Sequence, residues 1–351
     1  MPFNYSEGIF EALPVEIWNL IIEFLRQDSW SSLHALNLCC STFHELVVPV
    51  LFKKVHIYFP KYGEATGHLK LDALLSPDLG RCVCHHVRIF IVSYGHTLKK
   101  EYSEMIYALV ERLPNLQTIR WCLMPFPAGL LSNLMSRHSP PVFHYEGDPE
   151  NFEGINDRVA PFIKSASLTF PAPSVRHPLP DPHFIAFRNL LPSLPNLRRL
   201  ALKYRFPGPE RSRPILDLPP GSTLASVEDL ALANFSFSAG QAASWIRSLE
   251  AGTRLRRLSL HGSALDLYEF IHQLSTSGIP GGLTSLSLRV HNSSLQTSPQ
   301  LSEALISLLR RTTNLAEFLA YDLPKDVLHT VVSSHGGNIR RLGFRRTNYR
   351  A

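Results

Sequence analysis

Apolar residues recur along most of the chain in one spacing, L-x-x-L-x-L, and the alternation in its second half predicts a short strand with one apolar side. Further copies begin at Leu116, Val227 and Ile339, and looser ones at Phe52, Cys84, Pro140, Ser165 and Leu315. Counted from Phe52, the starts are 24 to 32 residues apart, so the pattern predicts a repeated structure. The clearest copies are Leu197, Leu200 and Leu202; Leu255, Leu258 and Leu260; and Leu283, Leu286 and Leu288.

Between the predicted strands lie patterns typical of amphipathic helices. Ser238 and Gln241 have the spacing of a capping box, which predicts a helix that begins there and ends near Gly252. The apolar faces expected for the helices are Ala242, Trp245, Ile246 and Leu249; Leu267, Phe270, Ile271 and Leu274; Leu301, Leu305, Leu308 and Leu309; and Val327, Leu328, Val331 and Val332.

A strand followed by a helix, about every 28 residues, is typical of the leucine-rich-repeat solenoid, in which each unit buries its apolar edge against its neighbours. The ninth position of that repeat usually holds Asn or Cys. Here it holds Met124, Arg205, Phe235, Ser263 and His291, so we expect an irregular solenoid. Two Pro-rich stretches, 171–182 and 206–221, are expected to leave the array as loops.

The first 50 residues have a different, purely helical pattern. Pro14 suits the first turn of a helix whose apolar residues Ile17, Leu20, Ile21, Phe24 and Leu25 fall on one face. Ser31 or Ser32 is predicted to cap a second helix, and a capping box from Thr42 to Glu45 to open a third. Three short helices barely enclose a core, so we expect part of their apolar surface to serve a partner.

The run from Leu13 to Leu25, followed by Leu38, Ser41, Phe43 and Leu46, resembles the F-box, in a form common in fungi. Cys39 and Cys40 depart from its usual Val-Cys or Val-Ser. The resemblance implies an F-box helical module at 8–52 that binds a Skp-type linker protein and through it a cullin, with a solenoid at 53–351 that holds a target protein for ubiquitination. Carried over position by position, the linker contacts are Leu13, Pro14, Ile17, Ile21, Leu25, Leu33, Leu36 and Phe43.

Other readings stay open beside this one. The helical module could merely cap the solenoid, or the chain could be a scaffold that binds the linker without ubiquitination. Cys82, Cys84, His85 and His86 resemble half of a zinc site, but no second pair stands at a matching spacing. Phosphate-binding and dinucleotide-binding glycine motifs are absent from the sequence, so we expect neither catalysis nor a cofactor or metal.

The compartment follows from other features of the sequence. The N-terminus lacks a secretory signal, and no apolar run reaches the roughly 18 residues that span a bilayer. We therefore expect a cytoplasmic or nuclear protein with free thiols and no membrane contact.

The net charge of +6 becomes informative when the charged residues are located on the predicted strands. Strand positions that face away from the helices carry nine cations against Glu146, Asp229 and Glu317. This pattern favours an acidic or phosphorylated target over nucleic acid, because few aromatic residues interleave with the cations. Solvated arginines in a basic protein remain the alternative. The expected target contacts are Arg120, Arg199, Lys203, Arg257, Arg289, Arg341 and Arg345; the other two cations are Lys54 and Arg88.

Overall fold

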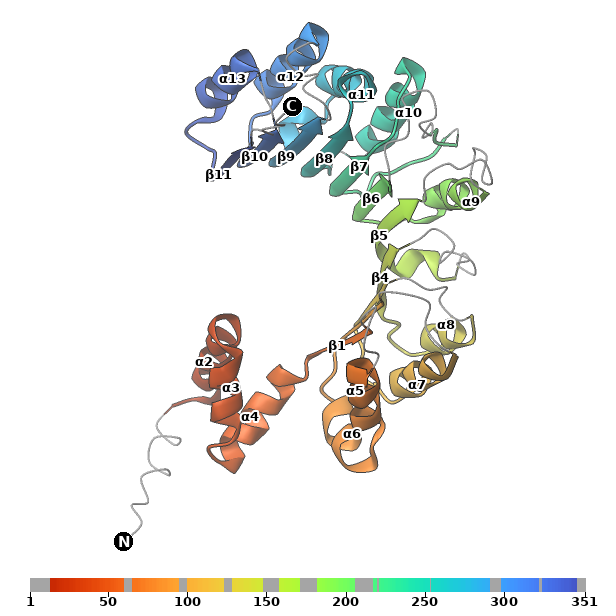
Figure 1. Cartoon of the computed structure of the whole chain (residues 1–351), viewed down its shortest axis with the longest axis vertical. Helices are drawn as coiled ribbons and strands as arrows, with labels where there is room; N and C mark the ends of the chain where they lie inside the picture. The colour runs from red at the N-terminus through yellow and green to blue at the C-terminus, as the bar shows by residue number, and fades with distance from the viewer. Residues whose placement is uncertain are drawn as a thin grey trace. The chain divides into compact units, whose positions relative to one another are not determined.

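The structure is a computed structural model that describes residues 13–59, 65–94, 100–122, 128–147, 158–170, 182–205, 217–219, 221–252, 254–290, 298–321 and 324–345. Within these ranges it is a mixed α/β structure with twelve α-helices and a parallel sheet of eleven strands (Figure 1). The α/β class predicted from the repeat spacing is thereby confirmed. Most of both Pro-rich loops predicted at 171–182 and 206–221 lies outside the described residues.

Strand order in the sheet follows the order of the chain. Each strand is followed by a connection that returns the chain to the same end of the sheet, which is what parallel pairing requires. The described residues divide into two units, one comprising 13–122 and 136–142 and the other comprising 128–135 and 143–345. No helix within the described ranges is long and apolar enough to cross a lipid bilayer.

Unit 1 begins with three helices that share a core of their own. Ile22, Leu33, Val47 and Leu51 are buried together, and Leu25, Leu36, Leu46, Val50 and Phe52 pack against them. The elements of unit 1 are α2 (Val15–Asp28), α3 (Trp30–Asn37), α4 (Ser41–Leu51), β1 (Lys54–Phe59), α5 (Ala65–Leu75), α6 (Pro77–Cys84), β2 (Ile89–Tyr94), α7 (Lys100–Glu111) and β3 (Thr118–Cys122).

The caps of these helices differ from the sequence prediction. Ser29 caps α3, because its side chain accepts a hydrogen bond from the backbone N–H of Ser32, whereas Ser31 and Ser32 lie inside the helix. Helix α4 begins at Ser41, one residue before the predicted cap Thr42, and its N-cap residue Cys40 makes no side-chain capping bond. The two predicted caps were therefore wrong, although both helices exist.

The second strand also differs from its prediction. Cys84 was taken as the start of a repeat, but it ends helix α6, and strand β2 begins only at Ile89. Phe90 is fully buried, in register with Val55 of β1 and Ile119 of β3. A repeat that began at Cys84 would have turned Ile89 toward the helices, whereas Phe90 faces them. The side to which each β2 residue points was therefore predicted wrongly.

Unit 2 repeats the strand-and-helix pattern with greater regularity. Its sheet has an apolar side in which Leu200, Leu230, Leu258, Leu286 and Phe318 stand in register across five strands, each at most 1% exposed. The elements are α8 (Ala128–Met135), β4 (Val142–Gly147), β5 (Ile163–Phe170), α9 (Pro182–Leu190), β6 (Arg199–Tyr204), β7 (Asp229–Ala233), α10 (Ala239–Glu250), β8 (Arg257–Gly262), α11 (Ala264–Thr276), β9 (Ser285–Val290), α12 (Pro299–Arg311), β10 (Glu317–Tyr321), α13 (Lys325–His335) and β11 (Arg341–Arg345).

Helices α9 to α13 cover the apolar side of this sheet (Figure 1). The capping box of Ser238 and Gln241 is confirmed, and it opens helix α10, which buries Trp245 and Leu249. The predicted apolar faces of α11 and α12 are buried as expected, whereas Val332 of α13 is 55% exposed. The other side of the unit 2 sheet, which we call the open face, has no described helix over it.

Candidate binding surfaces

Helix α2 is apolar on two sides. One side carries Ile22, which is fully buried in the core shared with α3 and α4. The other carries Ile17, Leu20, Ile21 and Phe24, of which Leu20 and Phe24 are each 67% exposed. An exposed stripe of large apolar residues on a helix that already has a core is typical of an interaction site.

The predicted linker contacts differ in how far they are exposed to solvent. Leu13, Pro14, Ile17 and Ile21 are exposed, whereas Leu25, Leu36 and Phe43 are half-buried. Phe43 packs edge-on against Trp18 of α2, with 5.1 Å between the ring centroids, so it also holds α4 against α2.

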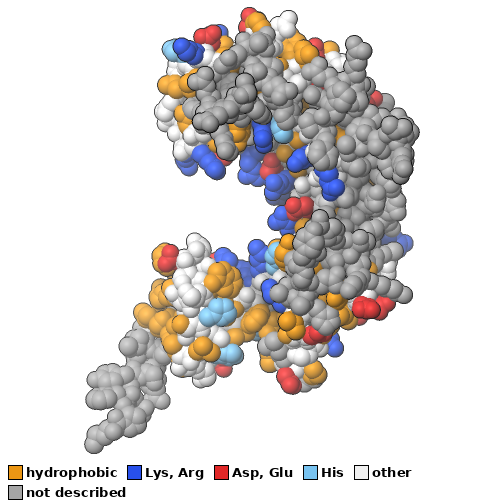
Figure 2. Space-filling view, in the orientation of Figure 1, with side chains coloured by type: hydrophobic (Ala, Val, Ile, Leu, Met, Phe, Trp, Pro, Cys, Tyr) orange, Lys and Arg blue, Asp and Glu red, His pale blue; other side chains and the backbone are white. Residues whose placement is uncertain are grey.

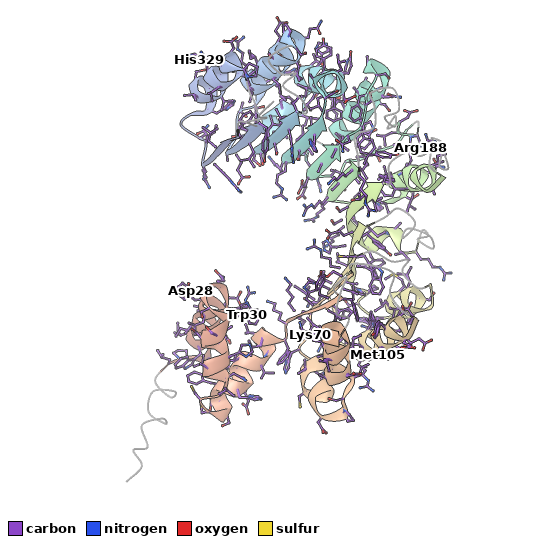
Figure 3. All side chains as sticks on the ribbon, in the orientation of Figure 1. Asp28, Trp30, Lys70, Met105, Arg188 and His329 are labelled. Atoms are coloured by element: carbon purple, nitrogen blue, oxygen red, sulfur yellow. The ribbon has the colours of Figure 1, made fainter. Side chains whose placement is uncertain are left out.

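Leu33 needs correction, because it is fully buried in the three-helix core and cannot contact a partner. Five exposed large apolar residues of the three helices were missing from the predicted set, among them Val15. Leu20 and Phe24 were already placed on the correct helix face by their spacing, and Leu38 is 83% exposed. Trp30, the first residue of α3, is half exposed (Figure 3). We call Ile17, Leu20, Ile21 and Phe24 the α2 stripe.

The open face of unit 2 presents its side chains in three rows that run across the strands. The first row lies at the amino ends of the strands and contains Ser165, Arg199, Asp229, Arg257, Ser285, Glu317 and Arg341. The middle row contains Glu146, Ser167, Ala201, Ala231, Ser259, Ser287, Leu319 and Gly343. The third row contains Thr169, Lys203, Ala233, His261, Arg289 and Tyr321.

Acidic residues in the first row are engaged by neighbours in that row. Arg199 Nε and Arg257 Nε lie 3.5 and 3.2 Å from the same oxygen, Oδ2 of Asp229. Further along, Ser285 Oγ donates to Glu317 Oε2 at 3.2 Å. The first row therefore neutralises part of its own charge.

Among the residues that the structure describes, the third row contains cations and no acidic residue. Lys203 and Arg289 are exposed, and the Arg289 guanidinium lies over the Tyr321 ring, 5.4 Å from its centroid. In Figure 2, Lys and Arg side chains gather along the strands of unit 2 with few acidic ones among them. Arg188 and His329 come instead from helices α9 and α13, away from the strands (Figure 3).

The structure accounts for most of the predicted target contacts. Arg199, Lys203, Arg257, Arg289 and Arg341 all lie on the open face of unit 2 and are exposed. Arg120 is exposed on β3 of unit 1, in register with Ile91. The side chain of Arg345 lies outside what the structure describes.

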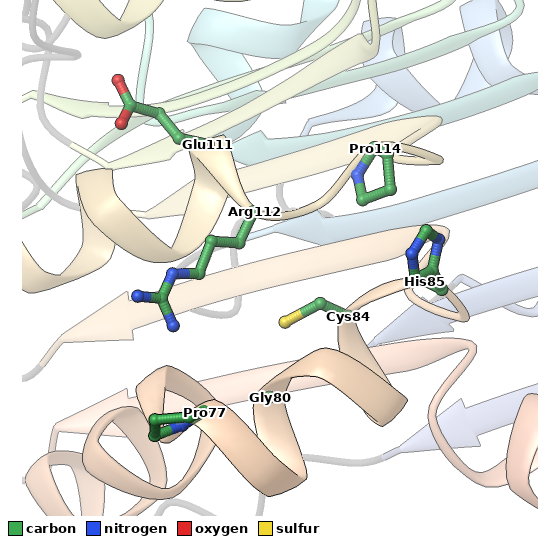
Figure 4. Close-up of a pocket in the computed structure, with 7 residues that line it drawn as sticks. All are labelled: Pro77, Gly80, Cys84, His85, Glu111, Arg112 and Pro114. Atoms are coloured by element: carbon green, nitrogen blue, oxygen red, sulfur yellow. The ribbon is translucent and has the colours of Figure 1, made fainter.

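A pocket of about 420 Å³ in unit 1 contains part of the Cys/His cluster singled out in the sequence (Figure 4). Burial raises the pKa of the Cys84 thiol, and the nearby Arg112 only partly opposes this. Arg112 donates a hydrogen bond to the Leu75 carbonyl. A thiol with a raised pKa is a weak nucleophile and a weak metal ligand. The pocket is also lined by Pro77, Gly80, His85, Glu111 and Pro114.

No group of three or more His, Cys, Asp or Glu side chains that could hold a metal ion occurs among the described residues. Neither the family models nor the curated proteins that we compared with this chain include a match.

Proposed function

We propose that this chain is the substrate-recognition subunit of a Skp–cullin–F-box ubiquitin ligase. In this proposal α2, α3 and α4 form an F-box that binds the Skp-type linker, and the strand-and-helix units form a leucine-rich-repeat solenoid that holds the target protein. The observation that carries the proposal is the α2 stripe, which coincides with the part of the sequence that resembles the F-box.

The energetics favour a partner on this stripe. Leu20 and Phe24 expose two thirds of their surfaces although the helix that carries them already buries Ile22 in a core. Removing a large apolar side chain from water contributes roughly 1.5–3 kcal/mol, so a partner that covered both would gain substantially. Interface anchors of this kind often cost about 2 kcal/mol or more of binding when they are truncated.

In this role the chain supplies orientation and makes no covalent bond. A ubiquitin ligase subunit of this kind accelerates transfer by holding the target near the reacting partners. The proposal therefore depends on two binding surfaces, the α2 stripe for the linker and a second surface on the repeats for the target.

Affinity purification of the tagged full chain tests the first surface. We expect the wild-type chain to bring down a Skp-type linker and a cullin, and Leu20→Ala with Phe24→Ala to lose both. Both side chains are exposed, so the thermal midpoint of the double variant should stay close to that of the wild type. Asn19→Ala, an exposed polar position on α2, is the matched control.

The outcomes separate the proposal from its rivals. A linker without a cullin would favour a scaffold that does not serve ubiquitination. Retention of the linker by the double variant at wild-type yield would show that the α2 stripe is not the docking surface. If the wild-type chain brings down neither protein, the helices serve only to cap the repeats.

A further inference from the structure

The cations on the open face of unit 2 are not equivalent. In the first row, Asp229 engages both Arg199 and Arg257 through one carboxylate oxygen. The two arginines and the aspartate together carry a charge of +1 rather than +2. An incoming anion would have to compete with a carboxylate that is only 18% exposed and already lies between them.

The third row offers its cations without such competition. Lys203 and Arg289 are exposed, and the register from β6 to β9 places Ala233 and His261 between them on the same row. The described members of this row include no carboxylate. Arg289 packs over Tyr321, which orients the guanidinium and leaves its charge intact.

Spacing along the row suits an extended chain. Lys203 and Arg289 are three strands apart, about 14 Å at the usual separation of neighbouring strands. An extended peptide covers about the same distance in four residues. The middle row holds only Ser and Ala between β5 and β9, so no long side chain there would keep such a peptide away from the sheet.

The chemistry favours a peptide over a nucleic acid. Single-stranded nucleic acids are generally bound by cations together with aromatic rings on which bases stack. In the third row the aromatic residue is Tyr321, and Arg289 already lies over its ring. Carboxylates or phosphates on a peptide need only the cations.

We infer that the third row, through Lys203 and Arg289, binds an extended acidic segment of the target protein, with anionic side chains about four residues apart. This inference rests on the proposed function, in which the repeats hold a target, and it names the chemistry of that target. Glutamate, aspartate and phosphoserine all supply the required anion.

Fluorescence anisotropy of labelled 12-residue peptides with the purified full chain tests the inference. One peptide carries Glu at every fourth position in a Ser and Gly background, a second carries phosphoserine there, and a third carries Gln. At about 0.05 M salt we expect the Glu or phosphoserine peptide to bind at least tenfold more tightly than the Gln peptide. The stronger of the two anions identifies the source of the charge.

Variants locate the site. Lys203→Gln with Arg289→Gln should weaken binding of the acidic peptide about tenfold. Arg247→Gln with Arg310→Gln, at exposed positions on α10 and α12, removes the same net charge from the helical side and should change binding less than twofold. Arg289→Gln alone should weaken binding more than Arg257→Gln alone, because Asp229 already engages Arg257. Thermal midpoints near that of the wild type establish that each variant is folded.

Several results would overturn the inference. Equal binding of the three peptides would show that the third row does not select anions. An effect of Arg257→Gln as large as that of Arg289→Gln would remove the distinction between the rows. Tighter binding of a single-stranded 12-nucleotide DNA, lost in the Lys203 and Arg289 double variant, would identify the occupant as nucleic acid.

Failure of this inference can be told apart from failure of the proposed function. The peptide assay contains no linker, and the Leu20→Ala with Phe24→Ala variant should bind the acidic peptide as the wild type does. If that variant loses the linker in purification while no peptide binds, the F-box proposal stands and the acidic target is refuted. If the peptide binds while the wild-type chain never brings down a linker, the reverse holds.

Discussion

Arg257 and Asp229 form an ion pair between neighbouring strands on the open face of unit 2. Arg257 Nε donates to Asp229 Oδ2 at 3.2 Å, and the two residues stand directly opposite each other in the register of β7 and β8. The aspartate side chain is 18% exposed and the arginine side chain 60% exposed. Asp229 therefore limits the positive charge of this face as well as linking two strands.

Replacement of Asp229 by Asn should separate these two effects. An exposed ion pair contributes up to about 1 kcal/mol and Asp229 makes two, so we expect a loss of at most about 2 kcal/mol in the free energy of unfolding at low salt. The loss should shrink at about 0.5 M salt, where screening weakens the pairs. Urea unfolding at both salt levels measures it, with the exposed Glu303→Gln of α12 as control. A loss that does not change with salt would mean that packing dominates at this position.

Asparagines placed just before the first apolar residue of a repeat connect successive units. Asn196 Nδ2 donates to the Pro161 carbonyl at 2.8 Å, and Asn115 and Asn314 make the equivalent bonds in their own repeats. These bonds satisfy carbonyl groups in the turn of the preceding unit.

We predict that Asn196→Ala lowers the free energy of unfolding by about 0.5–1.5 kcal/mol, the usual contribution of one hydrogen bond. Asn338 occupies the same place before Ile339, and its side chain makes no hydrogen bond to any residue that the structure describes. Asn338→Ala is therefore the matched control and should cost little. Urea unfolding measures the loss in the free energy of unfolding for both variants. Equal losses would show that the hydrogen bond to Pro161 is not the cause.

Helices α10 to α13 and the strands between them were predicted well from the sequence because each has one side in water and one side in the core, whereas α8 and α9 were not predicted. Where both sides of a strand are buried, the alternation disappears. In β2 the four residues Ile89 to Val92 are all apolar, and Ile91 on the open side is only 9% exposed. A continuous apolar run does not reveal which side faces the helices, and so the parity of β2 was predicted wrongly.

The candidate sites could be predicted only in part, for a similar reason. Periodicity placed Ile17 and Ile21 on one helix face, yet it could not tell which apolar face becomes the core. Nothing in the sequence distinguishes Leu33 from an exposed leucine, yet Leu33 is fully buried. The alternation also placed Arg199 and Arg257 on the correct side of the sheet, but only the strand register shows that Asp229 lies between them. The recurring Asn before the first apolar position was visible in the sequence and was missed.

Two glycines in and after helix α10 should respond to substitution in opposite ways. A Cβ atom on Gly252 would overlap the backbone carbonyl of Ala225, whereas a Cβ atom on Gly240 would have no atom within 4 Å. Gly252→Ala should therefore destabilise the protein by about 1–3 kcal/mol through overpacking. Gly240→Ala should stabilise it by about 0.5–1 kcal/mol, because alanine loses less backbone entropy in a helix. Thermal unfolding measures both, and a loss at Gly240 as large as that at Gly252 would contradict the explanation.

His56 makes the stability of the protein depend on pH. Burial lowers its pKa in the folded state, and the positive charges of Lys70, Lys54 and Arg120 lower it further. In the unfolded chain the same histidine takes up a proton near its ordinary value of about 6.5. The contribution of neutral His56 is therefore complete above about pH 6.5 and is lost as the pH falls from there toward the lower, folded-state pKa.

We expect the wild-type protein to lose stability between pH 7.5 and pH 5.5, and His56→Gln to lose less over the same interval. Urea midpoints at the two pH values give the comparison. Ser93→Ala is the control, because it removes the partner of the 2.5 Å contact to His56 Nε2 and keeps the titrating ring. A His56→Gln variant with the full pH dependence would show that the effect comes from other groups.

Interruption of the array should harm the protein more than removal of its first helices. A chain that ends at Leu288 lacks α12 and α13, and Leu286, which is 1% exposed in the full chain, would lose its neighbour Phe318 in β10. The face of α11 that packs against α12 would be exposed as well, and large exposed apolar patches cause association. We expect this chain to aggregate.

By contrast, deletion of 1–52 removes a core cluster whose members all lie within α2, α3 and α4 or directly after them, so the remainder should stay soluble and unfold cooperatively. Size-exclusion chromatography with light scattering and thermal unfolding would compare the two. A monomeric chain ending at Leu288, with the melting midpoint of the full protein, would refute the view that neighbouring units stabilise one another.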